Sequence, residues 1–275
     1  MPRVLTPDQV EQFHRLGYVH PFRAIDAMGA YEERRRLEAF EREVGHVAQK
    51  IMKIKAHLPF PSLVALGRCR AILDAVEDVL GPNILLFGAS LFSKDATDRR
   101  HVSWHQDSAY FGLEPHDEVT AWVGLTDSNP ENGCLRVLPG SHRGPDRAHI
   151  ETYAPDNLLA RGQRIDGIDE SQAVDLVLKA GEFSMHHERT VHGSLANRSN
   201  DRRIGLAFFF IPTHVRSTIG RRSAMLVRGE DRYGYWDADP VPRFDMDPVC
   251  VQRLHAAWDE YRDVGIKQAA ASGHI

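Results

Sequence analysis

The sequence predicts a mainly β protein with flanking helices, in which the strands form an antiparallel barrel or a double-sheet jelly roll. From Asn83 onward, short apolar or alternating runs are separated by clusters of Gly, Pro, Asn and Asp, a pattern typical of strands and turns. At least six such runs occur, and no helical pattern between them is long enough for the crossovers of a parallel sheet. The 275 residues, 42% of them hydrophobic, are enough to bury a core of this size.

The N-terminal part, about residues 1–82, has helical patterns. Thr6 and Pro7 form a favourable cap and first-turn pair, and Gly17 can end this first helix in a left-handed conformation. Two further helices are expected, over about residues 30–50 and residues 69–80. The sequence therefore predicts that helices precede the strands along the chain.

The strands are expected in a core of about residues 83–228, followed by a helical segment over about residues 248–270. We find no repeat or linker that would divide the chain, so residues 1–275 are expected to form a single domain. The six runs are ILLFGASLF (84–92), VTAWVGLTD (119–127), CLRVLP (134–139), AVDLVL (173–178), GEFSMH (181–186) and IGLAFFFIP (204–212).

Composition limits the possible functions. The chain has 34 Lys and Arg against 38 Asp and Glu, so its net charge of −4 offers no general attraction for nucleic acid. Only three cysteines are present, far apart in the sequence, and there is no run of 18 apolar residues, so we expect a cytoplasmic protein without disulfides or membrane spans. The 15 histidines direct attention to metal chemistry, because His is the commonest metal ligand.

The segment Trp104-His105-Gln106-Asp107 carries the first candidate ligands. If it is extended, residues two apart project from the same face, and His105 and Asp107 can converge on one metal ion. His192, in a later strand, would add a second imidazole. Two imidazoles and one carboxylate on one side of a metal leave the other positions open, the arrangement found in non-haem Fe(II) oxygenases.

His186 and His187 are alternative ligands, and HHERTVH superficially resembles the HExxH helix of zinc enzymes. However, His187 and His192 are five residues apart, whereas two ligands on one helical face are four apart. We interpret His142, in Pro-Gly-Ser-His, as a structural turn residue, and Trp104 as a packing residue.

Three motifs in order, HxD, GCLRVLPGSH (133–142) and VHGSLANRSNDRR (191–203), resemble the phytanoyl-CoA dioxygenase family of Fe(II)- and 2-oxoglutarate-dependent oxygenases. The similarity extends from the N-terminal helix to the strand that ends at Pro212. It implies a double-stranded β-helix, that is, a cupin-like jelly roll. It also implies that O2 and 2-oxoglutarate are consumed, that succinate and CO2 are released, and that an unactivated C–H bond is hydroxylated.

Transferred residue by residue, the resemblance makes His105, Asp107 and His192 the iron ligands. It implies that Arg203 binds the distal carboxylate of 2-oxoglutarate with help from Ser194, because a guanidinium pairs with a carboxylate through two hydrogen bonds. Arg202 and Arg198 are competitors for this role; Arg202 would point to the opposite face of the strand, and Arg198 lies in a turn. The resemblance also places two further residues in the cosubstrate pocket, Lys94 and Trp122.

The substrate is expected to be a small, polar or anionic metabolite or natural-product intermediate, because no large apolar stretch suggests a fatty acyl-CoA. Tyr110 and Phe111 follow the HxD motif and are expected to wall its pocket. Arg216 and Arg221 belong to an arginine-rich segment that could bind an anionic group, although these arginines could instead pair with nearby aspartates. Two rival functions are a cupin-like zinc hydrolase or isomerase and a non-catalytic small-molecule binding barrel.

Overall fold

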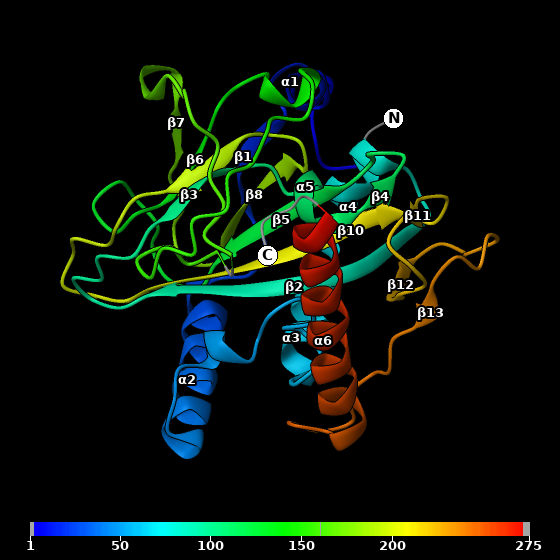
Figure 1. Ribbon diagram of the computed structural model, residues 1–275. Helices are drawn as coiled ribbons and strands as arrows, with labels where there is room; N and C mark the ends of the chain where they lie inside the picture. The colour runs from blue at the N-terminus through cyan, green and yellow to red at the C-terminus, as the bar shows by residue number, and fades with distance from the viewer. Residues whose placement is uncertain (1–2, 160, 272–275) are drawn as a thin grey trace.

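The computed structural model describes residues 3–159 and 161–271. Two β-sheets face each other, and helices cover the outer side of the larger sheet (Figure 1). The helices are α1 Pro7–Leu16, α2 Ala27–Val44, α3 Pro61–Gly67, α4 Arg70–Leu80, α5 Ser108–Phe111 and α6 Pro248–Ala271, with short 3-10 turns η1 Ala48–Lys50, η2 Ser141–Arg143 and η3 Glu170–Gln172. The jelly-roll prediction is confirmed.

The larger sheet has seven strands in the order β1-β8-β5-β10-β2-β12-β13, and the smaller has four in the order β3-β9-β6-β7. A two-stranded ribbon joins β11 to β4. The strands are β1 Tyr18–Arg23, β2 Ile84–Lys94, β3 Val102–His105, β4 Leu113–Glu114, β5 Val119–Gly124, β6 Leu135–Val137, β7 Val174–Leu176, β8 Glu182–His187, β9 His192–Ser194, β10 Arg203–Pro212, β11 Arg216–Ser217, β12 Ser223–Arg228 and β13 Asp237–Ala238. Each of the six expected runs overlaps one of these strands.

Strand β10 shows how alternation sorts side chains between core and site. Ile204, Leu206 and Phe208 point outward into the core beneath the helices. Arg203 and Phe209 have the opposite parity and point inward, between the two sheets. All residues of β10 are buried, but those on the helix side pack in an apolar core, whereas those on the other side line the partly polar space between the two sheets.

The N-terminal part differs from the prediction in one respect. Residues 18–23 form strand β1, which pairs with β8 at the edge of the large sheet, so this part is not entirely helical. The run Tyr18-Val19-His20-Pro21-Phe22 is short and contains a proline, which weakens a strand pattern in isolation. The first helix begins at its expected Thr6 cap, with a capping box from Gln9, and ends at Gly17.

In the described part of the chain, no helix combines the length and the hydropathy needed to span a bilayer. The three cysteines Cys69, Cys134 and Cys250 are free thiols.

Candidate metal centre

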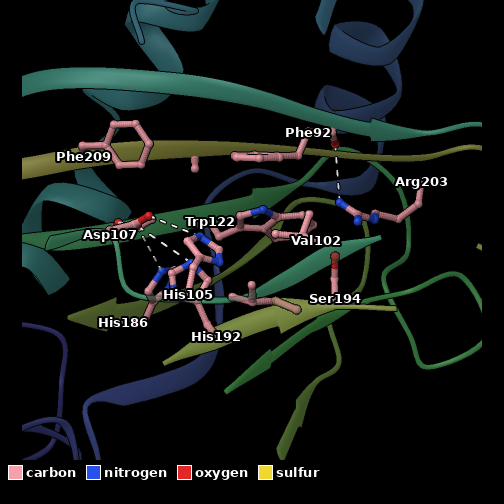
Figure 2. Close-up of a pocket in the computed structure, with 13 residues that line it drawn as sticks. Phe92, Val102, His105, Asp107, Trp122, His186, His192, Ser194, Arg203 and Phe209 are labelled. Carbon is pink, nitrogen blue, oxygen red and sulfur yellow. Dashed lines mark hydrogen bonds and ion pairs between the residues drawn. The ribbon is translucent and has the colours of Figure 1, made fainter. Parts of the chain in front are cut away.

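His105, Asp107 and His192 come together between the two sheets (Figure 2). One ligand atom from each lies within 4.8 Å of those of the other two. Strands β3 and β9 are antiparallel neighbours, and His105 and His192 are directly paired residues in this ladder. The paired strands thus place two imidazoles side by side, although their residues are 87 positions apart in the sequence.

Asp107 lies next to His105 as predicted, but not for the reason that the sequence suggested. Strand β3 ends at His105, and Asp107 has helical dihedral angles (φ −65°, ψ −30°) as the N-cap of α5. The carboxylate therefore converges with the imidazole because the chain turns into a helix, not because the two residues share one face of a strand. Its Oδ1 lies 3.5 Å from His105 Nε2, and its Oδ2 lies 3.9 Å from His192 Nε2.

Backbone carbonyls fix the orientation of both imidazoles. His105 Nδ1 lies 2.8 Å from the carbonyl of Ser103, and His192 Nδ1 lies 2.9 Å from the carbonyl of Thr190. Because a carbonyl can only accept, each Nδ1 carries a proton, and each Nε2 faces Asp107. In the neutral ring this is the tautomer that binds a metal through Nε2.

The electrostatics also suit a cation. Burial by itself would raise the pKa of Asp107, but the imidazoles of His192 and His105 outweigh it and lower that pKa to about 2. Burial lowers the pKa of His192 well below its ordinary value. Asp107 is therefore a carboxylate and His192 a neutral imidazole, the protonation states in which these two side chains bind a metal.

His186, an alternative ligand in the sequence, lines the same cavity from strand β8. It is buried, neither ring nitrogen has a hydrogen-bond partner in the described chain, and its Nε2 lies 3.9 Å from Asp107 Oδ2. His187 faces away, where its Nδ1 accepts from the amide of Arg189. Position 142 has its expected structural role, because the His142 ring bonds to the carbonyl of His14.

A cavity extends from this cluster to Arg203, and we call it the Arg203 cavity. Arg203 is 2% exposed and lies at the far end from His105, Asp107 and His192 (Figure 2). Its guanidinium donates to the carbonyls of Phe92 and Gly133, and no carboxylate of the described chain pairs with it. Burial lowers its pKa to about 10, so it still carries its charge at neutral pH.

The other residues predicted for the cosubstrate surround this guanidinium. The Trp122 ring lies 5.3 Å from it, and this packing requires Gly205, where a Cβ would lie 1.8 Å from the indole. Lys94 Nζ donates to Ser194 Oγ over 2.7 Å and to the carbonyl of Leu195. Burial, aided by the charge of Arg203, lowers the pKa of Lys94 to about 6.

The competing arginines lie elsewhere. Arg202 points to the opposite face of β10, where it pairs with Glu41 and Asp95. Arg216 pairs with Glu114 and Arg221 with Asp237, each at 61% side-chain exposure, and neither lines a cavity at the metal cluster. Both arginines thus form the ion pairs that were the alternative in the sequence, and their binding of an anionic substrate stays a prediction.

A second cavity opens on His105 and Asp107 from the other side, and we call it the Trp258 cavity. It contains the predicted wall residues Tyr110 and Phe111. Sequence reasoning missed the other residues of its wall, which come from β2 and β10, from the segment around η1, from helix α6, and from positions 158, 159 and 163. In the sequence, the only indication of these walls is the pair of aromatic residues Trp258 and Tyr261, three positions apart in the segment that forms α6.

Comparisons with known proteins agree with this geometry. The family model described as phytanoyl-CoA dioxygenase matches residues 1–205. A probable alpha-ketoglutarate-dependent hypophosphite dioxygenase of Stutzerimonas stutzeri is 30% identical over 60% of this chain and 58% of its own length. The peroxisomal phytanoyl-CoA dioxygenase of Bos taurus is 32% identical over 50% of this chain and 43% of its own length, so the matches span about half of these relatives.

Among solved structures, the apo form of the non-heme monooxygenase ThoJ superposes with a TM-score of 0.83. The two proteins are 31% identical, and the match covers 96% of this chain and 100% of the other. The similarity therefore includes the strands that carry the metal cluster and extends beyond the residues that the family model matches.

Proposed function

Because the chain belongs to the phytanoyl-CoA dioxygenase family, we propose that it is an Fe(II)- and 2-oxoglutarate-dependent dioxygenase that hydroxylates a C–H bond of a small molecule. One observation carries the proposal: Arg203 is a buried guanidinium without a carboxylate partner in the described chain, and its cavity opens at the other end on His105, Asp107 and His192. An unpaired buried charge is costly. A cavity with a cation at one end and a metal site at the other fits a dicarboxylate.

His105, Asp107 and His192 would hold the iron. Their donor set, two neutral imidazole nitrogens and one carboxylate, is the set that non-haem Fe(II) oxygenases use. Both imidazoles are already fixed by backbone carbonyls, so little reorganisation is needed when the metal binds. These three residues of this chain therefore fit the metal that the family implies.

Arg203 would bind the distal carboxylate of 2-oxoglutarate, and its planar fork allows two parallel hydrogen bonds. Ser194 lies on the same strand as His192 and is positioned to donate to that carboxylate. Lys94 holds Ser194 in place through the 2.7 Å contact and adds a donor near the cosubstrate. The indole of Trp122 forms the apolar floor between the two ends.

Iron bound here would supply the site at which O2 is reduced at the expense of 2-oxoglutarate, which leaves as succinate and CO2 while one oxygen atom enters the substrate. The protein residues perform the remaining tasks. Arg203 orients the cosubstrate, and Phe92 and Phe209, which line both cavities, help to exclude water. Tyr110 and Phe111 wall the opposite side, where the substrate would bind.

The rival functions explain less of the molecule. A zinc hydrolase or isomerase could use the same three ligands but would have no use for Arg203 or for the cavity that joins it to the metal cluster. A non-catalytic binding barrel would not need the two imidazoles to be held in their metal-binding tautomer.

The direct test is an assay of succinate formed from 2-oxoglutarate in the presence of Fe(II) and O2. We expect succinate from the wild-type protein even without the natural substrate, at a low uncoupled rate, and none from His192→Ala or Arg203→Ala. Loss of succinate when Zn(II) replaces Fe(II) is the matched control. If the protein forms no succinate and binds no 2-oxoglutarate, the proposal is wrong.

We also propose that the protein acts in the cytoplasm on a small-molecule substrate and binds neither nucleic acid nor membranes. Its three free thiols suit a reducing compartment, and its net charge of −4 gives it no general affinity for phosphate backbones. Cell fractionation tests the location: recovery of the protein with membranes would contradict it.

A further inference from the structure

The walls of the Trp258 cavity are mainly apolar and aromatic. Tyr110, Phe111 and Phe209 line it together with Trp258 and Tyr261 of α6. The two α6 rings are stacked, with centroids 5.7 Å apart and planes at 22°. Such walls bury an apolar or aromatic body.

A positive charge lies at the edge of this apolar cavity. Lys53 lines the Trp258 cavity, and its Nζ is 4.6 Å from the centre of the Trp258 ring. Partial burial lowers the pKa of Lys53, which shows that its ammonium is incompletely solvated. The indole face offers this ammonium a cation–π contact but no negative counter-charge.

No carboxylate of the described side chains pairs with Lys53. The nearby acidic residues of α6 are engaged elsewhere: Asp259 pairs with Arg262 and Glu260 with Arg253. The carboxylate among the residues that line the cavity is Asp107, which belongs to the metal cluster. The cavity therefore presents a cation that no described carboxylate neutralises.

We propose that the Trp258 cavity binds an organic anion, with its apolar or aromatic body against Trp258 and Tyr261 and its carboxylate or similar oxyanion on Lys53. This inference rests on the proposed function, because it treats the cavity as the substrate site of the dioxygenase. The ammonium anchors one end of the molecule, and the opposite end points to His105 and Asp107, where its C–H bond is oxidised. Lys53 is thus a specificity-determining residue.

The place of these residues in the chain supports a role in specificity. Trp258 and Tyr261 lie beyond residues 1–205, the range that the family model matches. Lys53 follows η1, next to Ile54, which has a positive φ of 63°. The metal and cosubstrate ends are built on strands, whereas Lys53, Trp258 and Tyr261 lie on a loop and a helix, and loops often carry the residues that determine binding.

The test is equilibrium binding of matched probes to the protein loaded with Mn(II) and saturating 2-oxoglutarate. Two skeletons, 3-phenylpropanoate and hexanoate, are each compared with their amide and amine, so that only the charge differs. We expect the carboxylates to bind about tenfold to a hundredfold more tightly than the amides, as measured by calorimetry. Lys53→Gln should remove this preference, and Lys53→Arg should keep it.

Lys50→Gln is the matched control, because Lys50 is an exposed lysine on η1 that does not line the Trp258 cavity. It should leave the preference unchanged. The inference is overturned if carboxylate and amide bind equally, if the amine binds most tightly, if no carboxylate binds at millimolar concentration, or if Lys53→Gln has no effect. If the probe binds only when 2-oxoglutarate is omitted, it occupies the Arg203 cavity, and the inference is also overturned.

The same titration without metal and 2-oxoglutarate separates this inference from the proposed function. If the protein forms no succinate but still shows a charge preference that depends on Lys53, the anion site is supported and the dioxygenase proposal is rejected. Succinate formation without any charge preference would support the dioxygenase and reject the anion site.

Discussion

The two cavities that meet at the metal cluster differ in how they are built. The Arg203 cavity lies among strands β2, β5, β8, β9 and β10, whose hydrogen bonds fix each side chain. The Trp258 cavity is lined in addition by residues that do not belong to strands, among them Lys53, Leu158, Leu159, Gln163 and two residues of helix α6. The side built on strands suits the cosubstrate, and the side assembled from separate segments suits the substrate.

The largest effect is expected from a substitution of Arg203, which should affect the Arg203 cavity alone. Arg203→Ala should weaken 2-oxoglutarate binding by at least about 100-fold, because one carboxylate of the cosubstrate would lose its buried partner. Binding of Mn(II) should persist. Arg202→Ala is the matched control, because Arg202 lies on the opposite face of β10 and pairs with Glu41. Calorimetry on Mn(II)-loaded protein measures both, and equal affinities in the two variants would contradict the comparison.

Lys94, which donates to Ser194 of the Arg203 cavity, is expected to make the free energy of unfolding depend on pH. Its folded pKa of about 6 lies below the ordinary value of 10.5, so between these values the unfolded chain binds a proton that the folded chain does not. The free energy of unfolding therefore rises with pH across this window, by at most about 1.4 kcal/mol per pH unit. We expect urea denaturation of the metal-free proteins from pH 6 to 9 to show that the free energy of unfolding increases with pH more in wild type than in Lys94→Met. The same pH dependence in both proteins would contradict this prediction.

A smaller effect is expected in the Trp258 cavity. Trp258→Ala removes an aromatic wall and the ring beneath Lys53, and it should weaken binding of 3-phenylpropanoate about tenfold. The affinity for 2-oxoglutarate should not change. Trp104→Ala is a suitable control, because this indole packs on Arg136 and does not line either cavity. Weakened 2-oxoglutarate binding in Trp258→Ala would mean that the cavities are not independent.

The smallest effect is expected outside both cavities. Arg216→Gln and Arg221→Gln each break an exposed ion pair, which contributes about 0–1 kcal/mol. Thermal melting should shift by a few degrees at most, and binding of 3-phenylpropanoate should be unchanged. A marked loss of probe binding in either variant would restore the arginine-rich segment as a substrate site.

The same contrast explains what could be predicted from the sequence. Alternation and turn residues locate the strands, and the resemblance in residues 133–142 and 191–203 selects His192, Ser194 and Arg203 from one region. The structure brings these residues together with Asp107, although a helical turn rather than a strand positions that carboxylate. Local sequence patterns were therefore sufficient to predict the ligands that lie on or next to paired strands.

The Trp258 cavity could not be predicted in this way. Lys53 and Trp258 are 205 residues apart in the sequence, and no strand pairing connects them. Their contact depends on how α6 packs against the segment after η1, which is a tertiary property. Conversely, Arg216 and Arg221 are conspicuous in the sequence but are neutralised by Glu114 and Asp237, one of which lies about 100 residues away.

Anaerobic titration of the Fe(II)-loaded protein with 2-oxoglutarate tests the central claim most directly. We expect a visible metal-to-ligand charge-transfer band that saturates at one equivalent of 2-oxoglutarate. The band should survive in Arg202→Ala, require much more 2-oxoglutarate in Arg203→Ala and be absent in His192→Ala. A wild-type protein without the band, or one whose band is unchanged in Arg203→Ala and His192→Ala, would contradict the account.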